Sequence, residues 1–264
     1  IEQCKRLWND IVEMQRKGKV GHFVGSIVNI AEQAMPTGVQ KYMIIDGQQR
    51  MTTLTLLLLA LRDYAIKNPG DTSINARRID NMLLKNEYEN GDERYKLLLT
   101  ETDRDILINL VEEKPIAEGT RSRLIENYKF FADKLADKEI LPAEVYESIG
   151  KLQIVNITLD RAVDDAQAIF ESLNSTGKEL SESDLIRNYV LMGLEPSEQI
   201  YVYEHLWRPM EQLFVYETQG TVMDAFFRHY LTMKLARIPK QGRVYEEFKL
   251  YHLNCEFGTI RELC

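Results

Sequence analysis

The chain has 264 residues, with 33 lysines and arginines against 41 aspartates and glutamates, so its formal net charge is −8 at pH 7. This length can bury a sizeable core in one large or two small domains, and the acidic balance excludes a protein that attracts nucleic acid over its whole surface. Three scattered cysteines without a Cys-x-x-Cys pair argue against a disulfide framework or a zinc knuckle, and the expected location is the cytoplasm.

The first 66 residues predict a helix, a hairpin and a second helix. Residues 1–16 place their apolar side chains on one side of a helix, and residues 20–30 and 39–45 alternate as two paired strands do. Residues 52–66 are apolar nearly all round, which predicts a central, buried helix. Its apolar run is too short to span a bilayer, so no membrane association is expected.

The rest of the chain is mostly helical by its pattern. Residues 71–150 are more charged and predict a helical insertion, whereas the β-branched run 152–159 predicts another strand. Helices are expected over 163–173 and after residue 180, and three more helical segments rich in aromatic residues follow from residue 198. The predicted fold class is α+β, with a small mixed sheet inside a mostly helical domain.

The most informative segment, Asp46-Gly47-Gln48-Gln49-Arg50, joins the second strand to the buried helix. Gly47 lets the backbone approach a ligand, and the N–H groups of 47–50 with the helix dipole can hold a phosphate. Arg50 offers a two-pronged fork to phosphate oxygens. Asp46 can hold a divalent cation or position an attacking water, while Gln48 and Gln49 can donate hydrogen bonds to a phosphate, ribose or base.

A purely structural interpretation of this segment stays open. Asp46 can cap the helix, Gln49 can complete a capping box, and Arg50 can pair with Asp46 or another carboxylate. Helix caps are frequent, so the residue types alone do not decide between the two interpretations.

A second polar segment follows residue 170. Asn174-Ser175-Thr176-Gly177 can form a backbone nest for an anion, with Lys178 beside it. Asp184, Arg187 and Asn188 then lie on one face of a helix. The alternative is an ordinary helix–loop–helix, with Ser181 as N-cap, Asp184 at the capping-box position and an Asp184–Arg187 surface pair.

Other catalytic and metal-binding patterns are missing from the sequence. The four histidines show no metal-ligand spacing, and there is no Walker loop, no Gly-x-Ser-x-Gly and no dinucleotide fingerprint.

The segment Tyr-Met-Ile-Ile-Asp-Gly-Gln-Gln-Arg-Met-Thr-Thr-Leu, with Ile-Phe-Glu-Ser-Leu-Asn-Ser-Thr-Gly-Lys-Glu-Leu-Ser-Glu-Ser-Asp-Leu-Ile-Arg-Asn later in the chain, strongly resembles the domain-of-unknown-function 262 family. This is the N-terminal domain of GmrSD-type, modification-dependent restriction endonucleases. Residues 7–11 and 23–28 fit the same family, and the resemblance covers about residues 1–192. The family is similar to the ParB and sulfiredoxin-like fold.

The resemblance implies that the chain binds and hydrolyses a nucleoside triphosphate with Mg²⁺ held at Asp46, within a bacterial defence system that restricts modified DNA. By position, the catalytic residues would be Asp46, Gln49 and Arg50. The nucleotide-binding residues would be Gly47, Gln48, Gln49, Arg50, Thr52, Asn174, Gly177, Lys178, Asp184, Arg187 and Asn188, with those from Asn174 onward forming a second wall of the cleft.

The expected organisation is a ParB/sulfiredoxin-like domain at 1–192, with its insertion at about 71–150, and a helical extension at 193–264. Family members usually begin with a Pro-x-Tyr-Gln-Arg-x-Tyr-x-Trp-like segment, and many carry a C-terminal HNH nuclease domain. Neither is present in this sequence, so the chain is expected to be a fragment of a longer protein whose other parts meet DNA.

Three other functions stay open at this point. The domain could bind DNA without catalysis, as ParB-like modules do, and such binding would weaken steeply with salt. It could instead be a DNA-nicking nuclease centred on Asp46. It could also be an interaction scaffold in which the motifs only maintain the fold.

Overall fold

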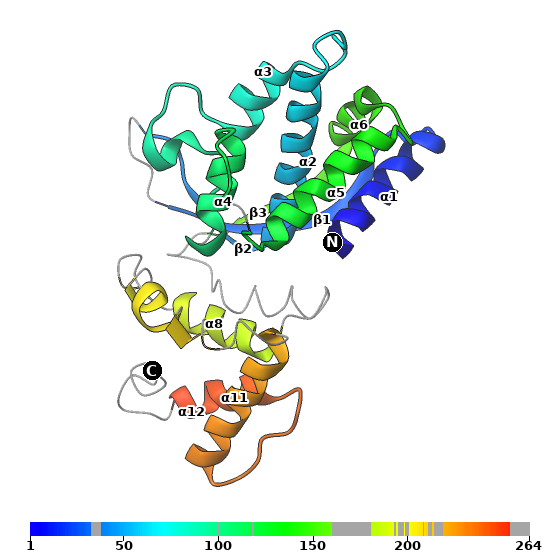
Figure 1. Cartoon of the computed structure of the whole chain (residues 1–264). Helices are drawn as coiled ribbons and strands as arrows, with labels where there is room; N and C mark the ends of the chain where they lie inside the picture. The colour runs from blue at the N-terminus through cyan, green and yellow to red at the C-terminus, as the bar shows by residue number, and fades with distance from the viewer. Residues whose placement is uncertain are drawn as a thin grey trace. The chain divides into compact units, whose positions relative to one another are not determined.

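The structure, a computed structural model, describes residues 1–32, 38–99, 101–117, 119–159, 181–192, 194, 198, 201–207, 209–210, 213 and 219–253. The chain forms two compact units, Ile1–Thr158 and Leu159–Cys264. A small three-stranded mixed sheet lies within a mostly helical chain (Figure 1), which confirms the predicted α+β class. The domain boundary expected at residue 192 stays a prediction.

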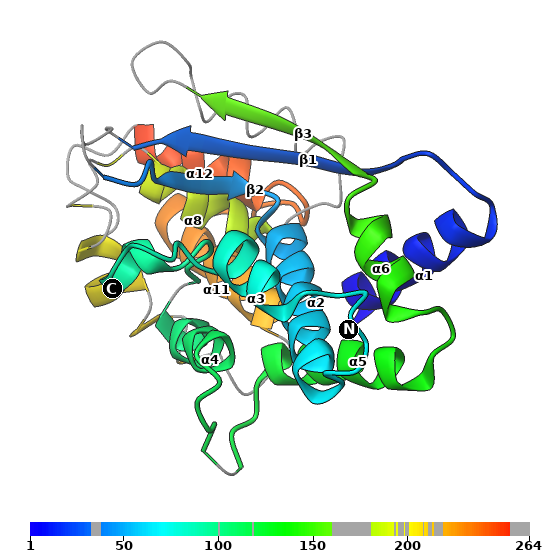
Figure 2. The same ribbon diagram turned by 90° about the horizontal axis from the view of Figure 1, so that it is seen from above.

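The sheet has the order β2-β1-β3, with strands β1 (His22–Ala31), β2 (Tyr42–Asp46) and β3 (Leu152–Leu159). The predicted hairpin is confirmed, because β1 and β2 pair antiparallel. Figure 2 shows β3 running in the same direction as β1. Val28 lies opposite Asp46 while Asn29 lies opposite Ile44, so Ile45 forms a bulge just before the turn into α2.

Six helices complete the described part of the N-terminal unit. They are α1 (Glu2–Arg16), α2 (Gln48–Lys67), α3 (Ala76–Ile79), α4 (Glu101–Val111), α5 (Arg123–Asp137) and α6 (Pro142–Ile149), with a π-helical turn at Asp80–Leu84 and a 3₁₀ turn at Gly91–Arg94. Helix α2 starts directly after β2 (Figure 2) and packs against α5, while α1 packs against α6.

Helix α2 is the centre of the first core, as its apolar pattern predicts. Leu56, Leu57 and Leu61 are fully buried, and Trp8 from α1 joins the same cluster. Because leucines point to several sides of this helix, it must be surrounded by other elements rather than lie on the surface. The packing of these buried side chains therefore fixes the position of α2, and with it the N-terminal end that follows β2.

One charged side chain, Arg62, is buried inside this apolar core with only 1% of its surface exposed. It donates hydrogen bonds to the carbonyl oxygens of Leu110 (2.9 Å) and Val111 (2.7 Å) at the end of α4. Its guanidinium also lies 2.7 Å from a carboxylate oxygen of Asp63 and 3.1 Å from one of Asp80. These contacts supply the hydrogen bonds and opposite charge that a buried cation requires.

The network continues through two further cations and another carboxylate. Lys85, itself buried, lies 3.0 Å from Asp80 and 3.6 Å from Glu112, and Arg94 lies 3.0 Å from Glu112. Burial raises the pKa of the Glu112 carboxyl, but the hydrogen bond from Arg94 and the charge of Lys85 outweigh it, so its pKa lies below 4.5.

The lowered pKa of Glu112 predicts an acid-dependent contribution to stability. The folded state holds this carboxylate ionised more readily than the unfolded chain does, so the stabilisation is full above pH 4.5 and is lost as the pH falls through the folded pKa. Glu112→Gln should therefore be less stable than the wild type at pH 7, and the difference should shrink below pH 4.5. Urea unfolding between pH 3 and 7 measures it, with the exposed Glu147→Gln as a control of small effect. A difference that does not vary with pH would contradict the assignment.

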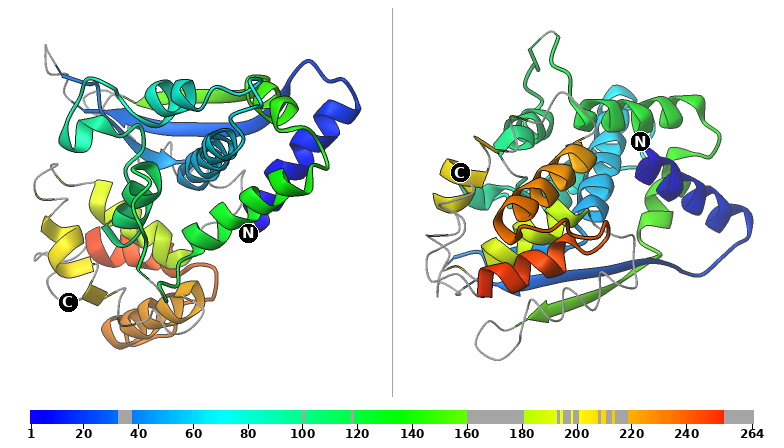
Figure 3. Two further views of the ribbon diagram at one scale, coloured as in Figure 1. Left: turned by 45° about the horizontal axis from the view of Figure 1, so that its top comes forward. Right: turned by 90° about the horizontal axis from the view of Figure 1, so that it is seen from below.

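The second unit contains α8 (Glu182–Met192), a π-helical turn at Tyr203–Trp207, α11 (Gln219–Leu235) and α12 (Val244–Leu253). Helices α8, α11 and α12 contact one another (Figure 3) around the buried side chains of Trp207, Phe227 and Phe248. The helix expected over 163–173 lies outside the described residues. Among the described residues, no helix is both long and apolar enough to cross a membrane.

Candidate functional site

The turn between β2 and α2 is tight and depends on a glycine. Gly47 has φ +93° and ψ 7° and is the N-cap residue that directly precedes α2. A Cβ atom at this position would lie 3.0 Å from Ile27 Cγ1 and 3.1 Å from the carbonyl oxygen of Ser26. The backbone at Gly47 therefore lies directly against β1, where a side chain would have no room.

The N-terminus of α2 has no side-chain cap from the described residues. No side chain among them accepts a hydrogen bond at this cap, and the first turn contains no acidic residue. The interpretation in which Asp46 caps the helix and Gln49 closes a capping box is therefore wrong. The side-chain oxygen of Gln49 accepts a hydrogen bond from Gln3 Nε2 at 2.8 Å instead. A helix of 20 residues thus presents the positive end of its dipole without a capping carboxylate from the described part of the chain.

Arg50 lies in this first turn and is only loosely matched by negative charge. Its Nη1 donates a hydrogen bond to the carbonyl oxygen of Ser26, and it lies 3.8 Å from Asp46 Oδ2. The Arg50 and Asp46 side chains are 35% and 36% exposed. A pair this long and this open contributes little to stability. The expected Asp46–Arg50 pair is present, but it leaves the guanidinium accessible to solvent.

Gln48 and Thr52 make local bonds along the same turn. Gln48 Nε2 donates to the carbonyl oxygen of Ile44 at 3.0 Å, and Thr52 Oγ1 donates to the carbonyl oxygen of Gln48 at 2.9 Å. Both side chains therefore support the connection between β2 and α2. Their role in nucleotide binding stays a prediction.

The second polar segment is described only from residue 181. Ser181 is confirmed as the N-cap of α8, since its Oγ accepts the N–H of Asp184 at 3.1 Å. Arg187 lies 3.1 Å from an Asp184 carboxylate oxygen, as the surface-pair interpretation expects. Asn188 is partly buried on the same helix. Asn174, Gly177 and Lys178 lie outside the described residues.

The start of α8 differs from the start of α2 because protein groups satisfy it. Besides the Ser181 cap, the N–H of Ser183 donates to Asp224 Oδ1 at 2.7 Å. A carboxylate from α11 thus occupies the place that an anion would take. Asp46–Arg50 and Asp184–Asn188 belong to different compact units, so the second wall of the cleft stays a prediction.

A protein-family model decides the relationship of this chain to known proteins. The model, described as GmrSD restriction endonuclease, N-terminal domain, matches residues 1–191. The chain belongs to this family. No curated protein matches it. Membership makes this GmrSD N-terminal domain a component of a restriction, or anti-phage, system whose substrate is DNA.

Two residues that contact Arg50 in the GmrSD domain were not among the predicted site residues. Ser26 supplies the carbonyl oxygen that holds Arg50, and Gly25 has φ +116° and lies against the same guanidinium. A single glycine within an alternating strand pattern signals a close backbone approach. That signal was available in the sequence, although it does not say which side chain approaches.

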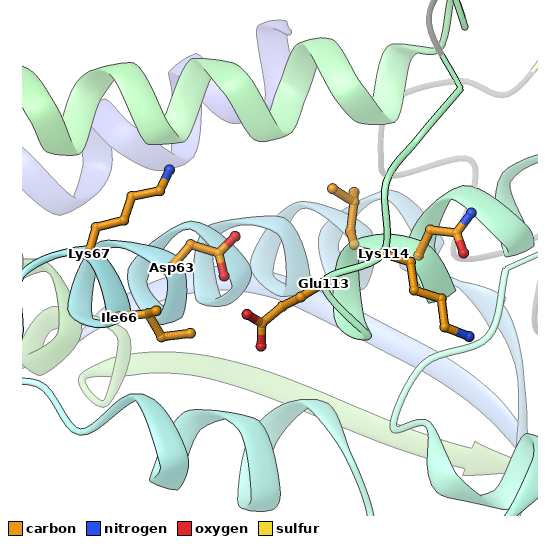
Figure 4. A pocket seen from close by; sticks show the side chains of 7 residues that line it. Asp63, Ile66, Lys67, Glu113 and Lys114 are labelled. Carbon is orange, nitrogen blue, oxygen red and sulfur yellow. The ribbon is translucent and has the colours of Figure 1, made fainter.

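A pocket of about 250 Å³ lies elsewhere on the GmrSD domain, between the second half of α2 and the end of α4 with the residues that follow it (Figure 4). Its lining includes Asp63, Lys67, Glu113 and Lys114. Asp63 lies thirteen positions after Arg50, so the two places are separated by roughly 20 Å along α2. Two acids and two lysines offset each other, so this pocket does not select a triphosphate.

Metal ligands do not gather in the described part of the GmrSD domain. No group of three or more His, Cys, Asp or Glu side chains there could hold an ion. Asp46 therefore belongs to no described group of three or more such ligands, and in that setting Mg²⁺ would take its remaining ligands from substrate phosphates and water.

Proposed function

We propose that this chain is the nucleotide-handling domain of a restriction system that recognises modified DNA, and that a nucleoside triphosphate binds where β2 turns into α2. The observation that carries the proposal is the state of Arg50. This cation occupies the positive end of a 20-residue helix that no described side chain caps. It bonds to the Ser26 carbonyl oxygen and forms only a long, solvent-accessible pair with Asp46, at 3.8 Å. Such an arrangement is stabilised by a bound anion.

The backbone of the turn and three of its side chains, Asp46, Gln49 and Arg50, have roles in this proposal. The N–H groups at the start of α2 and the Arg50 guanidinium bind phosphate oxygens. Asp46 would hold Mg²⁺, which supplies charge neutralisation between the phosphates. The amide of Gln49, whose oxygen is already bonded to Gln3, keeps its N–H donors for the ligand.

Hydrolysis at this site would join a water oxygen to the terminal phosphorus and break the bond between that phosphorus and the bridging oxygen of the nucleoside diphosphate. Arg50 would stabilise the negative charge that develops on the transferred group, and Asp46 would orient either Mg²⁺ or the water. Phosphate and the nucleoside diphosphate then leave, and the proton lost by the water passes to solvent. We further propose that this reaction takes place in the cytoplasm and that it controls a DNA-cutting nuclease, such as an HNH domain. The remaining nucleotide-binding residues in this proposal are Asn174, Gly177, Lys178, Asp184, Arg187 and Asn188.

The test is calorimetric titration of the chain with a non-hydrolysable triphosphate analogue and Mg²⁺. Arg50→Ala should keep its helical circular dichroism but bind at least about tenfold more weakly, because charge-assisted hydrogen bonds contribute about 1.5–3 kcal/mol each. Arg16→Ala is the matched control, since Arg16 is 66% exposed and pairs with Glu139 at the far end of α1.

Undiminished affinity of Arg50→Ala would remove the site assignment.

A parallel gel shift on unmodified and modified DNA separates the alternatives. DNA binding that needs no nucleotide and weakens steeply with salt would support a ParB-like binding module instead. Equal plasmid nicking by the wild type and Asp46→Ala would exclude a nuclease centred on Asp46.

A further inference from the structure

The guanidinium of Arg50 lies over a bare stretch of backbone in β1. An ideal Cβ atom at Gly25 would lie 2.7 Å from Arg50 Nε, 3.0 Å from Cζ and 3.3 Å from Nη2. These three atoms form one edge of the guanidinium, so that edge lies in the space that a side chain at Gly25 would take. The third nitrogen, Nη1, meanwhile donates to the carbonyl oxygen of the next residue, Ser26.

Gly47 limits the same guanidinium from the helix side. A Cβ atom there would lie 3.2 Å from Arg50 Nη1. Both glycines have positive φ, +116° at Gly25 and +93° at Gly47. The missing side chains of Gly25 and Gly47 together provide the space that the Arg50 side chain occupies. An arginine side chain has several rotatable bonds, so fixing it in one conformation costs conformational entropy. Because the backbone at Gly25 and Gly47 already restricts the side chain of Arg50, less of this entropy is lost when a ligand binds.

We infer that Gly25 is a positioning residue for Arg50. Its missing side chain leaves the space in which the guanidinium lies beside β1, with Nη1 on the Ser26 carbonyl oxygen, and so fixes where the fork can meet an anion at the start of α2. The orientation of the fork is therefore set by the neighbouring strand as well as by the helix that carries it. That Gly25 affects ligand binding rests on the proposed function, whereas the seating of Arg50 does not.

A methyl group at Gly25 meets the far end of a flexible side chain, so the arginine moves away rather than the strand. Gly25→Ala has two separable effects: backbone strain at φ +116°, which any side chain suffers, and displacement of Arg50 from Ser26. In a protein that already carries Arg50→Ala, Gly25→Ala can no longer displace the arginine, and only the backbone strain remains. A double-mutant cycle separates the two.

The first experiment compares melting temperatures of the wild type, Gly25→Ala, Arg50→Ala and the double variant. The loss caused by Gly25→Ala should be about 2–4 °C smaller when Arg50 is already alanine. Gly91→Ala is the control, because Gly91 has φ +57° and open space around it, so its loss should be the same in both backgrounds. Equal losses for Gly25→Ala in both backgrounds would show that backbone strain alone requires the glycine, and would overturn the inference.

The second experiment titrates the same four proteins with a triphosphate analogue and Mg²⁺. Gly25→Ala should weaken binding about tenfold, and the double variant should bind no more weakly than Arg50→Ala. Losses that multiply would mean that Gly25 acts on the ligand independently of Arg50, which also overturns the inference. If Arg50→Ala binds as the wild type does, the proposed function fails, and the melting temperatures still decide whether Gly25 seats the arginine.

Discussion

Arg62→Met is expected to lower the free energy of unfolding of the N-terminal unit by about 3 kcal/mol, the lower end of the range for breaking a buried ion pair. The change leaves the carbonyl oxygens of Leu110 and Val111 without this donor inside the core. Asp63 and Asp80 lose a cation, although Asp63 keeps its hydrogen bond from Tyr128 and Asp80 keeps Lys85. Urea unfolding followed by circular dichroism measures the loss.

Arg16→Met is the matched control, because it removes the same charge from an exposed pair with Glu139. It should change stability by no more than about 1 kcal/mol. A methionine in place of Arg62 fits the space of the arginine stem, so a loss below about 1 kcal/mol would show that desolvating the charged groups offsets nearly all of their attraction.

Gly47→Ala is expected to destabilise the same unit by about 2–5 kcal/mol. The left-handed backbone costs an L-residue roughly 1–2 kcal/mol, and forcing a methyl group against a packed neighbour costs about 1–3 kcal/mol. The close neighbours here are Ile27 Cγ1 at 3.0 Å and the backbone oxygen of Ser26 at 3.1 Å. A backbone oxygen within the sheet cannot move aside as the end of a long side chain can.

Gly70→Ala separates these effects from the general consequence of replacing a glycine. Gly70 lies in the turn after α2, has no positive φ and has no atom within 4 Å of its ideal Cβ. Its replacement should change stability by less than about 1 kcal/mol, and in the favourable direction. Similar losses at Gly47 and Gly70 in thermal unfolding would show that the turn into α2 is not tightly constrained.

The strands and the central helix were predictable because their side-chain patterns are local. Alternation over residues 20–30 and 39–45 predicts a hairpin, and the structure pairs β1 with β2 accordingly. The apolar sides of residues 52–66 predict burial, and α2 is the centre of the core. The helix begins earlier than predicted, at Gln48, because polar residues of a first turn do not show the apolar period.

The candidate site was predictable only in part. The residue types of Asp46–Arg50 indicated an anion site or a capped helix, and the lack of a cap from any described side chain removes the second interpretation for Asp46 and Gln49. The burial of Arg62 could not be predicted, because the apolar residues beside it in the sequence do not indicate that a cation there is buried. Its partners include carbonyl oxygens of residues 110 and 111.

The sequence by itself determined the fold class, the strand–turn–helix that carries Asp46–Arg50 and the membership of the GmrSD family. Only the tertiary structure decided what surrounds the two arginines of α2. Every residue has the same backbone carbonyl group, and every glycine has the same bare backbone. The sequence therefore does not indicate which of these groups a side chain far along the chain will contact. That is settled when β1 packs beside the start of α2, and when the end of α4 packs beside its second half.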